Sequence, residues 1–306
     1  MNFLITGASG YIGSSILKQI NNKNNKIVVI SRKGKKKFPK INNLSVIKYD
    51  DESNLKKFIS STDIIIHAAS IDAINCKKNK KKCHIFNYDY SKKLFELAKK
   101  SNVKKFIFLS TIHVYSDFLQ GLITIKSKRR NNDPYAFLKR KVEDYLINNS
   151  IKEIQVIILR ISNVYGIVQN EDFILSNSFV HQFCKEIVYK NTITINNYDK
   201  INRNLISLNK LNKVITYIIK KNYKSPKVFN IGGKSSYRLI DIANIISARY
   251  FSLSGNRSKI ISKKILKKTI DHLNYKINFP INIADNVNKE IDKIIYFYKK
   301  NKFLSK

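Results

Sequence analysis

The chain has 306 residues, of which 43% are hydrophobic, and its formal net charge at pH 7 is +37. This length and apolar content exclude an intrinsically disordered chain and predict one large or two ordinary domains with a sizeable core. No apolar run reaches the roughly 18 residues of a transmembrane helix, and the first residues lack the basic-then-apolar order of a signal peptide. We therefore expect a cytoplasmic protein without membrane insertion.

The positive charge allows two interpretations. Lysine, asparagine and isoleucine abound along the whole chain, while there are only 9 glycines, 4 prolines and no tryptophan, a bias that A/T-rich codons would produce. The densest basic run, 77–82, is then a solvated loop. The alternative is a basic nucleic-acid-binding protein, because such charge attracts polyanions nonspecifically. No RNA-binding signature with interleaved aromatic residues is present, so we expect no specific nucleic-acid partner.

Three cysteines occur, Cys76, Cys83 and Cys184. Their number is odd, no C-x-x-C pair is present, and no set of histidines and cysteines completes a metal site. We therefore expect free thiols in a reducing compartment and no bound metal.

The N-terminal segment has the order strand, glycine turn, helix. Residues 2–6 form a short apolar run, and apolar residues then recur at helical spacing from Ile12 onward. Glycines in such a turn let the backbone approach a pyrophosphate, which the helix N-terminus then faces. An ordinary strand–helix turn is the alternative. The segment predicts a dinucleotide site formed by Gly7, Ser9, Gly10, Tyr11, Ile12 and Gly13.

The second strand, 27–30, ends in Ser31 and Arg32, and more lysines follow. A site for NAD usually presents an acidic residue here to the ribose 2′-hydroxyl, whereas an arginine suits the 2′-phosphate of NADP. The sequence therefore predicts NAD(P) binding with NADP favoured. The alternative is that Arg32 belongs to the general excess of basic residues.

A candidate proton-transfer group lies in the middle of the chain. A buried strand, 103–109, ends in Ser110 and Thr111, and ligands of parallel sheets bind beyond such strand ends. Downstream, Asp133 and Pro134 predict a helix start, which places Tyr135 and Lys139 on one helix face. Tyr-x-x-x-Lys occurs six times in the chain, so the surroundings carry the prediction rather than the spacing.

The chemistry of this group follows from its residue types. A free tyrosine has a pKa of about 10, which a neighbouring ammonium group lowers by favouring the phenolate. Tyr135 would then exchange a proton with a sugar hydroxyl or carbonyl while hydride moves to or from the cofactor, and Thr111 would orient the same oxygen. The alternative is a half-buried aromatic residue and a solvated lysine.

Taken together, these segments resemble the extended short-chain dehydrogenase/reductase proteins, that is, the sugar-nucleotide epimerase/dehydratase family. The resemblance runs from residue 1 to about 245. Beyond the glycine turn it rests on the segments 63–69, 110–115, 159–166, 203–208 and 229–233.

The resemblance implies an α/β fold with a Rossmann-type doubly wound parallel sheet and a smaller C-terminal α/β substrate domain. The cofactor domain would comprise 1–166 and about 203–231, and the substrate domain about 167–202 and 232–306. The resemblance also implies a homodimer. It adds the cofactor residues Asp50, Asp51, Ala68, Ala69, Ser70, Asn87 and Ser110, with Tyr135 and Lys139, and the substrate residues Thr111, Asn163 and Arg203.

The departures from the family pattern narrow the reaction. Ile112 and His113 stand where the 4,6-dehydratases carry an Asp-Glu pair, which argues against dehydration. Asn204 and the pair Asn209-Lys210 replace acids after Arg203. His67 and His113 are interpreted as strand-end residues with satisfied hydrogen bonds.

We therefore expect an NAD(P)-dependent sugar-nucleotide oxidoreductase or epimerase, with a keto-sugar reductase favoured over a 4-epimerase. A catalytically impaired cofactor-binding regulatory or scaffold protein remains the alternative from another functional class.

Overall fold

A computed structural model describes residues 1–32, 38, 41, 43–116, 119–168, 178–195, 201–262 and 271–304. Its centre is a seven-stranded sheet with the order β11-β7-β5-β4-β1-β2-β3, in which every neighbouring pair is parallel. The strands are β1 (Asn2–Thr6), β2 (Lys26–Ser31), β3 (Leu44–Lys48), β4 (Ile64–His67), β5 (Lys105–Thr111), β7 (Gln155–Ile161) and β11 (Lys227–Ile231). The predicted Rossmann-type sheet is confirmed.

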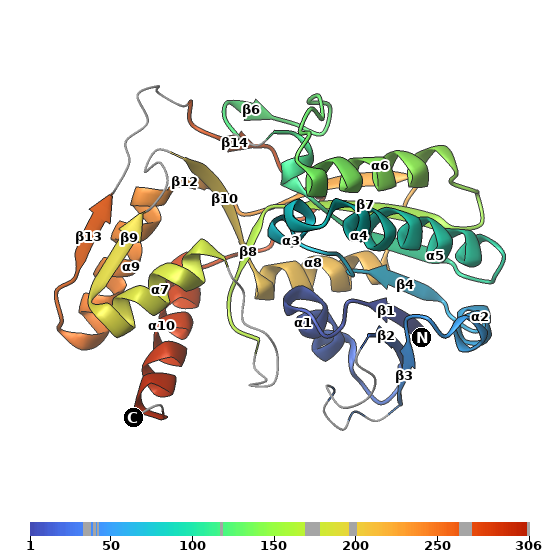
Figure 1. Cartoon of the computed structure of the whole chain (residues 1–306), viewed down its shortest axis with the longest axis horizontal. Helices are drawn as coiled ribbons and strands as arrows, with labels where there is room; N and C mark the ends of the chain where they lie inside the picture. Colours follow the sequence, from blue (N-terminus) through green and yellow to red (C-terminus); the bar gives the residue numbers. More distant parts are fainter. Residues whose placement is uncertain are drawn as a thin grey trace.

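Helices cover both faces of this sheet, as Figure 1 shows. On one face, α1 (Tyr11–Ile20) and α8 (Leu208–Lys220) pack against one set of strand side chains. On the other face, α2 (Glu52–Ser60), α5 (Tyr90–Lys99) and α6 (Pro134–Asn148) pack against the alternate set. Because both faces of the sheet are covered, most strand side chains are buried and apolar, which is why most of these strands were recognisable as short apolar runs.

A second, smaller core lies beside the large sheet, at the left of Figure 1. It is formed by α7 (Phe179–Lys190), α9 (Leu239–Ser254), α10 (Val287–Leu304) and the parallel pair β9 (Thr192–Ile195) and β13 (Lys259–Ser262). A three-stranded sheet of β12 (Ser236–Arg238), β10 (Asn202–Ser207) and β8 (Asn163–Tyr165) lies between the two cores, and β6 (Leu122–Ile123) pairs with β14 (Asn274–Tyr275).

The basic run 77–82 is helical, so the prediction of a solvated loop is wrong. The segment forms α3 (Ala73–Lys78) and α4 (Lys80–His84), followed by a π-helical turn, Ile85–Asp89, that leads into α5. Asp72 caps α3 and Asn79 caps α4, because each side chain accepts a hydrogen bond from a backbone N–H three residues later. The lysines remain exposed on the outer side.

The prediction of three free thiols is also wrong. Cys76 on α3 and Cys83 on α4 form a disulfide with their Cα atoms 5.1 Å apart, and only Cys184 is free. The two short helices fold back on each other, which brings together cysteines that sequence spacing alone could not pair. Within the described part of the chain, no helix combines the length and apolar content needed to cross a membrane.

Candidate active site

The glycine turn between β1 and α1 is closed too tightly for larger residues. Gly7 has φ +73°, and a Cβ atom there would lie 2.6 Å from the backbone nitrogen of Ala69. A Cβ at Gly13 would lie 2.1 Å from the carbonyl oxygen of Gly7, so α1 packs directly on the turn. Such contacts require glycine, and they leave the N-terminus of α1 open to an anionic group.

A cavity of about 210 Å³ lies beside this turn. It is lined by seven of the predicted cofactor residues, namely Gly7, Ser9, Gly10, Arg32, Ala68, Ala69 and Ser70. Sequence reasoning missed the other six, Thr6, Ile30, Tyr49, Ile71, Phe86 and Tyr90. Three of the missed residues are aromatic, and the Arg32 guanidinium lies 5.8 Å from the Phe86 ring centroid. No local spacing marks all three aromatic residues, because Tyr49 follows β3 whereas Phe86 and Tyr90 belong to the π-helical turn and the start of α5.

Below the cavity, a chain of hydrogen bonds runs through buried polar side chains. His67 Nδ1 lies 2.6 Å from Thr6 Oγ1, and His67 Nε2 lies 2.7 Å from Ser91 Oγ. The Ser91 hydroxyl donates to the Asn87 carbonyl, so it accepts from Nε2, and the imidazole is the neutral Nε2–H tautomer. Burial lowers the pKa of His67 to about 3. His67 is thus a satisfied core histidine, as predicted.

Asn87 supports the edge of the cavity rather than lining it. Its Oδ1 accepts a hydrogen bond from the Ile71 N–H at 2.7 Å, and its Nδ2 donates to the Ile71 carbonyl at 2.9 Å. These two bonds hold the loop after β4 against the π-helical turn.

The remaining predicted cofactor residues of the first segments lie outside the cavity lining. The Tyr11 hydroxyl donates to the Gly166 carbonyl, and Ile12 packs into the apolar cores. Ser31 is buried, Asp50 is exposed, and Asp51 caps α2 by accepting from the Asn54 N–H. Gly13 faces the turn itself.

Tyr135 and Lys139 lie in the first two turns of α6, as the sequence predicts. The helix begins at Pro134, and the Asp133 side chain accepts from the Tyr135 N–H. The Lys139 ammonium donates to the Leu109 carbonyl of β5 at 2.8 Å and lies 5.8 Å from the Tyr135 ring centroid. Burial lowers the pKa of Lys139 to about 7.

The pKa of Tyr135 departs from expectation. Burial, with smaller contributions from Asp72 and Asp133, raises it to about 12, so the prediction of a lowered pKa is wrong. The physical reason is that Lys139 is itself buried and directed at a backbone carbonyl, while two carboxylates lie near the phenol.

The two hydroxyl residues at the end of β5 differ in their contacts. Thr111 Oγ1 accepts from the His113 N–H at the start of a 3₁₀ turn, Ile112–Val114. The Ser110 hydroxyl instead donates to the Glu143 carboxylate, so its side chain turns toward α6 and away from the strand end.

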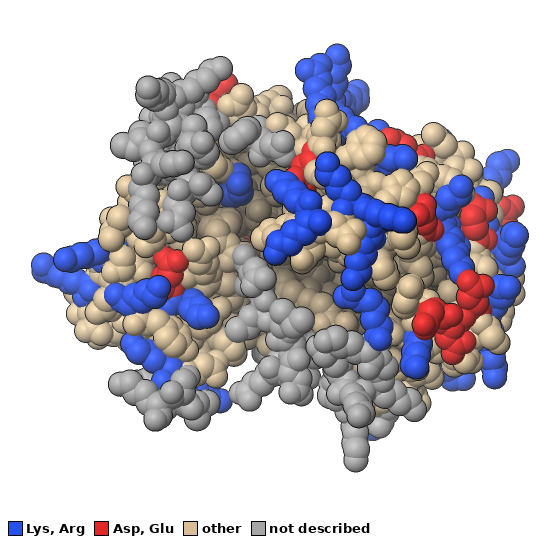
Figure 2. Space-filling model, viewed as in Figure 1, with Lys and Arg blue, Asp and Glu red and all other residues tan. Residues whose placement is uncertain are grey.

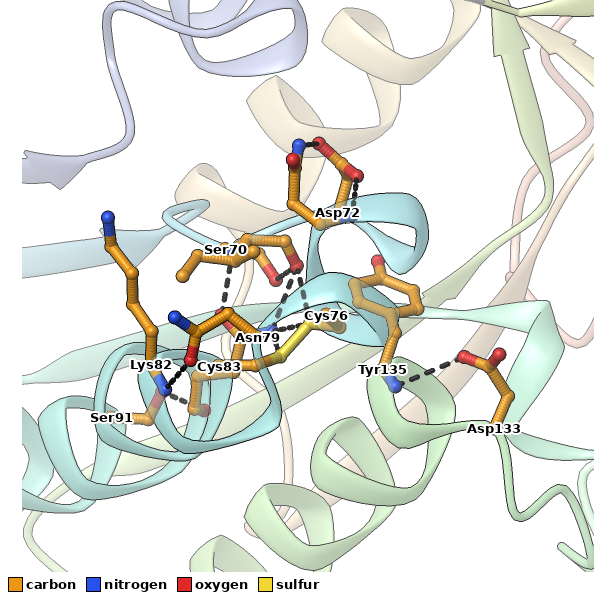
Figure 3. The surroundings of a disulfide bond; sticks show 12 residues. Ser70, Asp72, Cys76, Asn79, Lys82, Cys83, Ser91, Asp133 and Tyr135 are labelled. Carbon is orange, nitrogen blue, oxygen red and sulfur yellow. Dashed lines mark hydrogen bonds between the residues drawn. A yellow bond between two sulfur atoms is a disulfide. The ribbon is translucent and has the colours of Figure 1, made fainter.

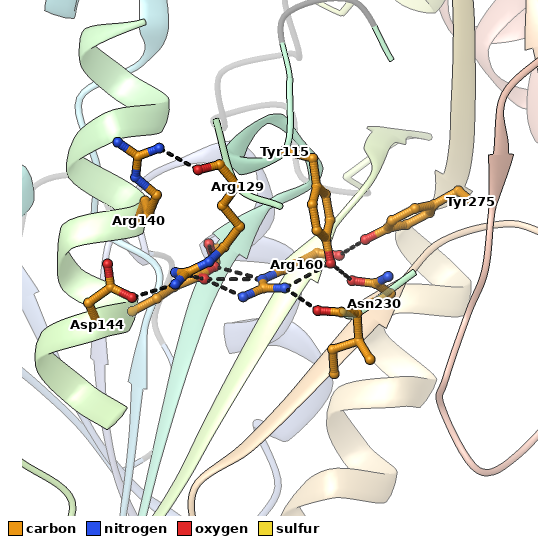
Figure 4. A network of polar contacts seen from close by, with 10 residues as sticks. Tyr115, Arg129, Arg140, Asp144, Arg160, Asn230 and Tyr275 are labelled. Atoms are coloured by element: carbon orange, nitrogen blue, oxygen red, sulfur yellow. Dashed lines mark hydrogen bonds and ion pairs between the residues drawn. The ribbon is translucent and has the colours of Figure 1, made fainter. Parts of the chain in front are cut away.

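A buried ionic network, shown in Figure 4, was not foreseen. The Glu143 carboxylate is fully buried and accepts from Nε and Nη2 of Arg160 and from Arg129. Arg160 also donates to the Tyr115 hydroxyl, which donates to Asn230 of β11. Glu143 follows Lys139 by four residues, so the same helix-face argument that paired Tyr135 with Lys139 could have found it.

The two predicted substrate residues Asn163 of β8 and Arg203 of β10 lie in the same three-stranded sheet. The Asn163 amide donates to the Asn204 carbonyl at 3.0 Å, and Arg203 donates to the Asn202 carbonyl at 2.9 Å. The Asn204 side chain braces the loop after β11 by bonding to Gly233 N–H and C=O. An amide can both donate and accept there, which an ionised carboxylate could not.

Comparison with known proteins identifies the family of this chain. Residues 3–232 match the profile of the NAD dependent epimerase/dehydratase family. The chain belongs to this family. The family assignment agrees with the resemblance seen in the sequence.

Two curated relatives are similar to this chain over most of its length. An uncharacterized UDP-glucose epimerase, YtcB, of Bacillus subtilis is 23% identical over 277 residues, covering 85% of this chain and 84% of the relative. An ADP-L-glycero-D-manno-heptose-6-epimerase of Brachyspira hyodysenteriae is 24% identical over 270 residues, covering 82% of each.

Solved structures show the same fold. The UDP-N-acetylglucosamine 4-epimerase of Methanobrevibacter ruminantium, in complex with UDP-N-acetylmuramic acid, has a TM-score of 0.84 at 22% identity and covers 98% of both chains. The UDP-glucuronic acid 4-epimerase of Bacillus cereus, in complex with UDP-glucuronic acid and NAD, has a TM-score of 0.77 at 20% identity, covering 98% of this chain and all of that one.

Proposed function

We propose that this protein epimerises a nucleotide sugar by reversible hydride transfer with a retained NAD, Tyr135 serving as acid and base. The observation that carries the proposal is the juxtaposition of two parts at one edge of one sheet. The glycine turn after β1 and the Tyr135–Lys139 pair beside the end of β5 both face the carboxyl ends of the strands, where open α/β sheets bind ligands.

The residues present fit NAD. The turn at Gly7 and Gly13 leaves no room for a Cβ atom, so the backbone can approach a pyrophosphate at the N-terminus of α1. Tyr49, Phe86 and Tyr90 offer apolar ring surface to the adenosine half. When bound, NAD supplies the acceptor for a hydride from a sugar carbon.

The chain's own residues would handle the proton. The Tyr135 phenolate would take the proton of the reacting sugar hydroxyl and would later return a proton to the same oxygen, while bound NAD would supply the hydride chemistry. Thr111 orients that oxygen by a hydrogen bond. Because burial raises the pKa of Tyr135 to about 12, a positive charge beside the phenol, such as oxidised NAD would supply, would favour the phenolate.

Substrate contacts follow from the smaller sheet. Arg203 and Asn163 lie on adjacent parts of β10 and β8, where a guanidinium and an amide can meet a pyrophosphate and a sugar. We further propose that 1–166 with about 203–231 form the cofactor domain, that the rest forms the substrate domain, and that the protein is a homodimer.

A keto-sugar reductase that uses NADPH is the second candidate. A cavity of about 380 Å³ adjoins the cofactor cavity and shares Arg32 with it, and Lys78 and Lys82 also line it. Three cations beside the expected ribose position suit a 2′-phosphate. Against this, the relatives named above are epimerases, and the solved structure that names its cofactor names NAD, so we rank the reductase second.

The experiment that tests the proposal is native mass spectrometry of the freshly purified protein, followed by absorbance of the small molecule released on denaturation. Retained NAD(H) supports the epimerase. An empty protein that then binds NADPH more tightly than NADH supports the reductase instead. A protein that binds neither cofactor overturns both functions.

A further inference from the structure

The disulfide between Cys76 and Cys83 lies against the proposed acid/base residue. Figure 3 shows the bond between α3 and α4, with Tyr135 of α6 beside it. Both cysteines are fully buried and form one apolar cluster with Leu138, against which Tyr135 and Ile71 pack. The disulfide therefore touches the helix that carries Tyr135.

The same disulfide also contacts the support of the cofactor cavity. The Asn87 amide donates to the sulfur of Cys83 at 3.2 Å and lies 3.4 Å from the sulfur of Cys76. Through the same nitrogen Asn87 holds the carbonyl of Ile71, a residue that lines both cavities beside Arg32. One covalent bond thus borders the tyrosine on one side and the cofactor loop on the other.

We propose that Cys76 and Cys83 form a thiol–disulfide exchange site that controls the position of Tyr135 and of the loop at Ile71. The inference rests on the proposed function, because it assigns regulation to that site. Two thiol groups of a dithiol reductant would be oxidised to their disulfide while the Cys76–Cys83 bond takes up two electrons and two protons. Atoms and electrons balance without any other reactant.

We expect reduction to displace the neighbours of the disulfide, because two thiol groups need more space than one disulfide bond. Two non-bonded sulfur atoms need more separation than the roughly 2 Å of a disulfide, so reduction pushes α3 and α4 apart inside a packed cluster. The neighbours that must give way are Leu138, Tyr135 and the amide of Asn87. The oxidised form holds Tyr135 in its packed position, and the reduced form displaces it.

Access to the sulfurs requires local opening, because both are fully buried. The α3–α4 segment consists of two helices of 6 and 5 residues with an exposed basic outer side, which Figure 2 shows in blue beside the hollow at the centre of this face. Such short helices open at little cost compared with global unfolding. We therefore expect exchange with a dithiol over minutes to hours rather than at once.

The test compares the oxidised holoprotein with the same protein after dithiothreitol treatment and desalting. Cysteines are counted by alkylation under denaturing conditions, with one expected free in the oxidised protein and three in the reduced one. We expect reduction to lower kcat by about ten-fold, since a displacement of about 1 Å at a reacting group can cost up to 100-fold. Reoxidation should restore kcat.

Two further readouts separate positioning from general damage. Reduction should loosen the burial that raises the pKa of Tyr135 and so move the acidic limb of the kcat profile to lower pH. Cys76→Ser should match the reduced protein and no longer respond to dithiothreitol. Cys184→Ser, which changes a buried thiol in the other core, should keep the full response.

The inference is overturned if oxidised and reduced proteins have the same kcat and pH profile, or if three free thiols persist under mild oxidation. If neither form turns over any nucleotide sugar, the proposed function fails and NADH binding decides the inference separately. A different NADH affinity in the two forms would then support the exchange site, and an equal affinity would overturn it.

Discussion

The Glu143 carboxylate, one helical turn beyond Lys139 on α6, accepts hydrogen bonds from both Nε and Nη2 of Arg160 in β7, at 3.1 and 2.8 Å. Both side chains are buried, and the pair joins the helix that carries Tyr135 to the strand next to β5. This pair ties α6, which carries the proposed acid/base residue Tyr135, to β7 of the central sheet.

Removal of one partner of this pair should destabilise the fold strongly. Glu143→Gln leaves the guanidinium of Arg160 buried and unpaired, so we expect a loss of about 3–5 kcal/mol in the free energy of unfolding. Urea unfolding followed by circular dichroism measures it. The control is Arg238→Met, which breaks an exposed pair with Asp241 and should cost about 1 kcal/mol or less. Equal losses in both variants would contradict the structural role of Glu143.

Tyr135→Phe should remove most turnover and leave cofactor binding intact. In the proposed mechanism this hydroxyl carries the proton, and a positioned acid/base group contributes roughly 10²–10⁴-fold to the rate. Turnover of nucleotide sugars and NADH affinity are the two measurements. Tyr217→Phe is a matched control, because Tyr217 near the end of α8 belongs to another Tyr-x-x-x-Lys match. The Tyr217 ring packs against Phe279. If Tyr135→Phe retains nearly full turnover, the assignment fails.

Lys139 should make stability depend on pH. Its folded pKa is about 7 and its unfolded value is 10.5, so between these values the unfolded chain binds more protons than the folded one. Stability therefore rises as the pH increases from about 7 to 10, by a few kcal/mol at most for this group. Urea unfolding at pH 7 and 9.5 should show a smaller rise for Lys139→Met than for the natural chain. If the free energy of unfolding rises equally in both proteins, burial does not disfavour the charged form of Lys139.

Arg32 should govern the choice between the two cofactors. Arg32 lines the cavity expected to hold the ribose. It also lines the adjoining cavity, together with Lys78 and Lys82. Arg32→Ser should weaken NADPH binding by about ten-fold, which corresponds to one charged hydrogen bond, and change NADH binding little. Calorimetry with both cofactors gives the comparison. Equal weakening of both would show that Arg32 contacts a part that they share.

Much of the fold was predictable because its strands are buried on both faces and are therefore continuous apolar runs. The glycine turn was predictable because Gly7 and Gly13 meet backbone atoms that exclude any Cβ. The helix at Tyr135 was predictable because Asp133 and Pro134 are a strong local start signal. Each of these signals is local in sequence.

The parts that were missed depend on contacts between distant segments. Tyr49, Phe86 and Tyr90 meet around the cofactor cavity only once β3 and the π-helical turn are placed. The helices of the basic run were missed for another reason, since their caps Asp72 and Asn79 are local, but the run of exposed lysines resembles a solvated loop. The raised pKa of Tyr135 depends on how deeply α6 is buried, which no spacing reveals.

The central claim is that a hydride would pass from a sugar carbon to one enzyme-bound NAD and return to the same carbon. The most direct test is proton NMR of UDP-glucose, UDP-N-acetylglucosamine and UDP-glucuronic acid, each incubated with the purified protein in D₂O. We predict that at least one of these nucleotide sugars is converted to its C4 epimer and that C4 retains ordinary hydrogen rather than deuterium. Epimerisation with deuterium at C4, or no epimer from any sugar under conditions where NAD is bound, would contradict it.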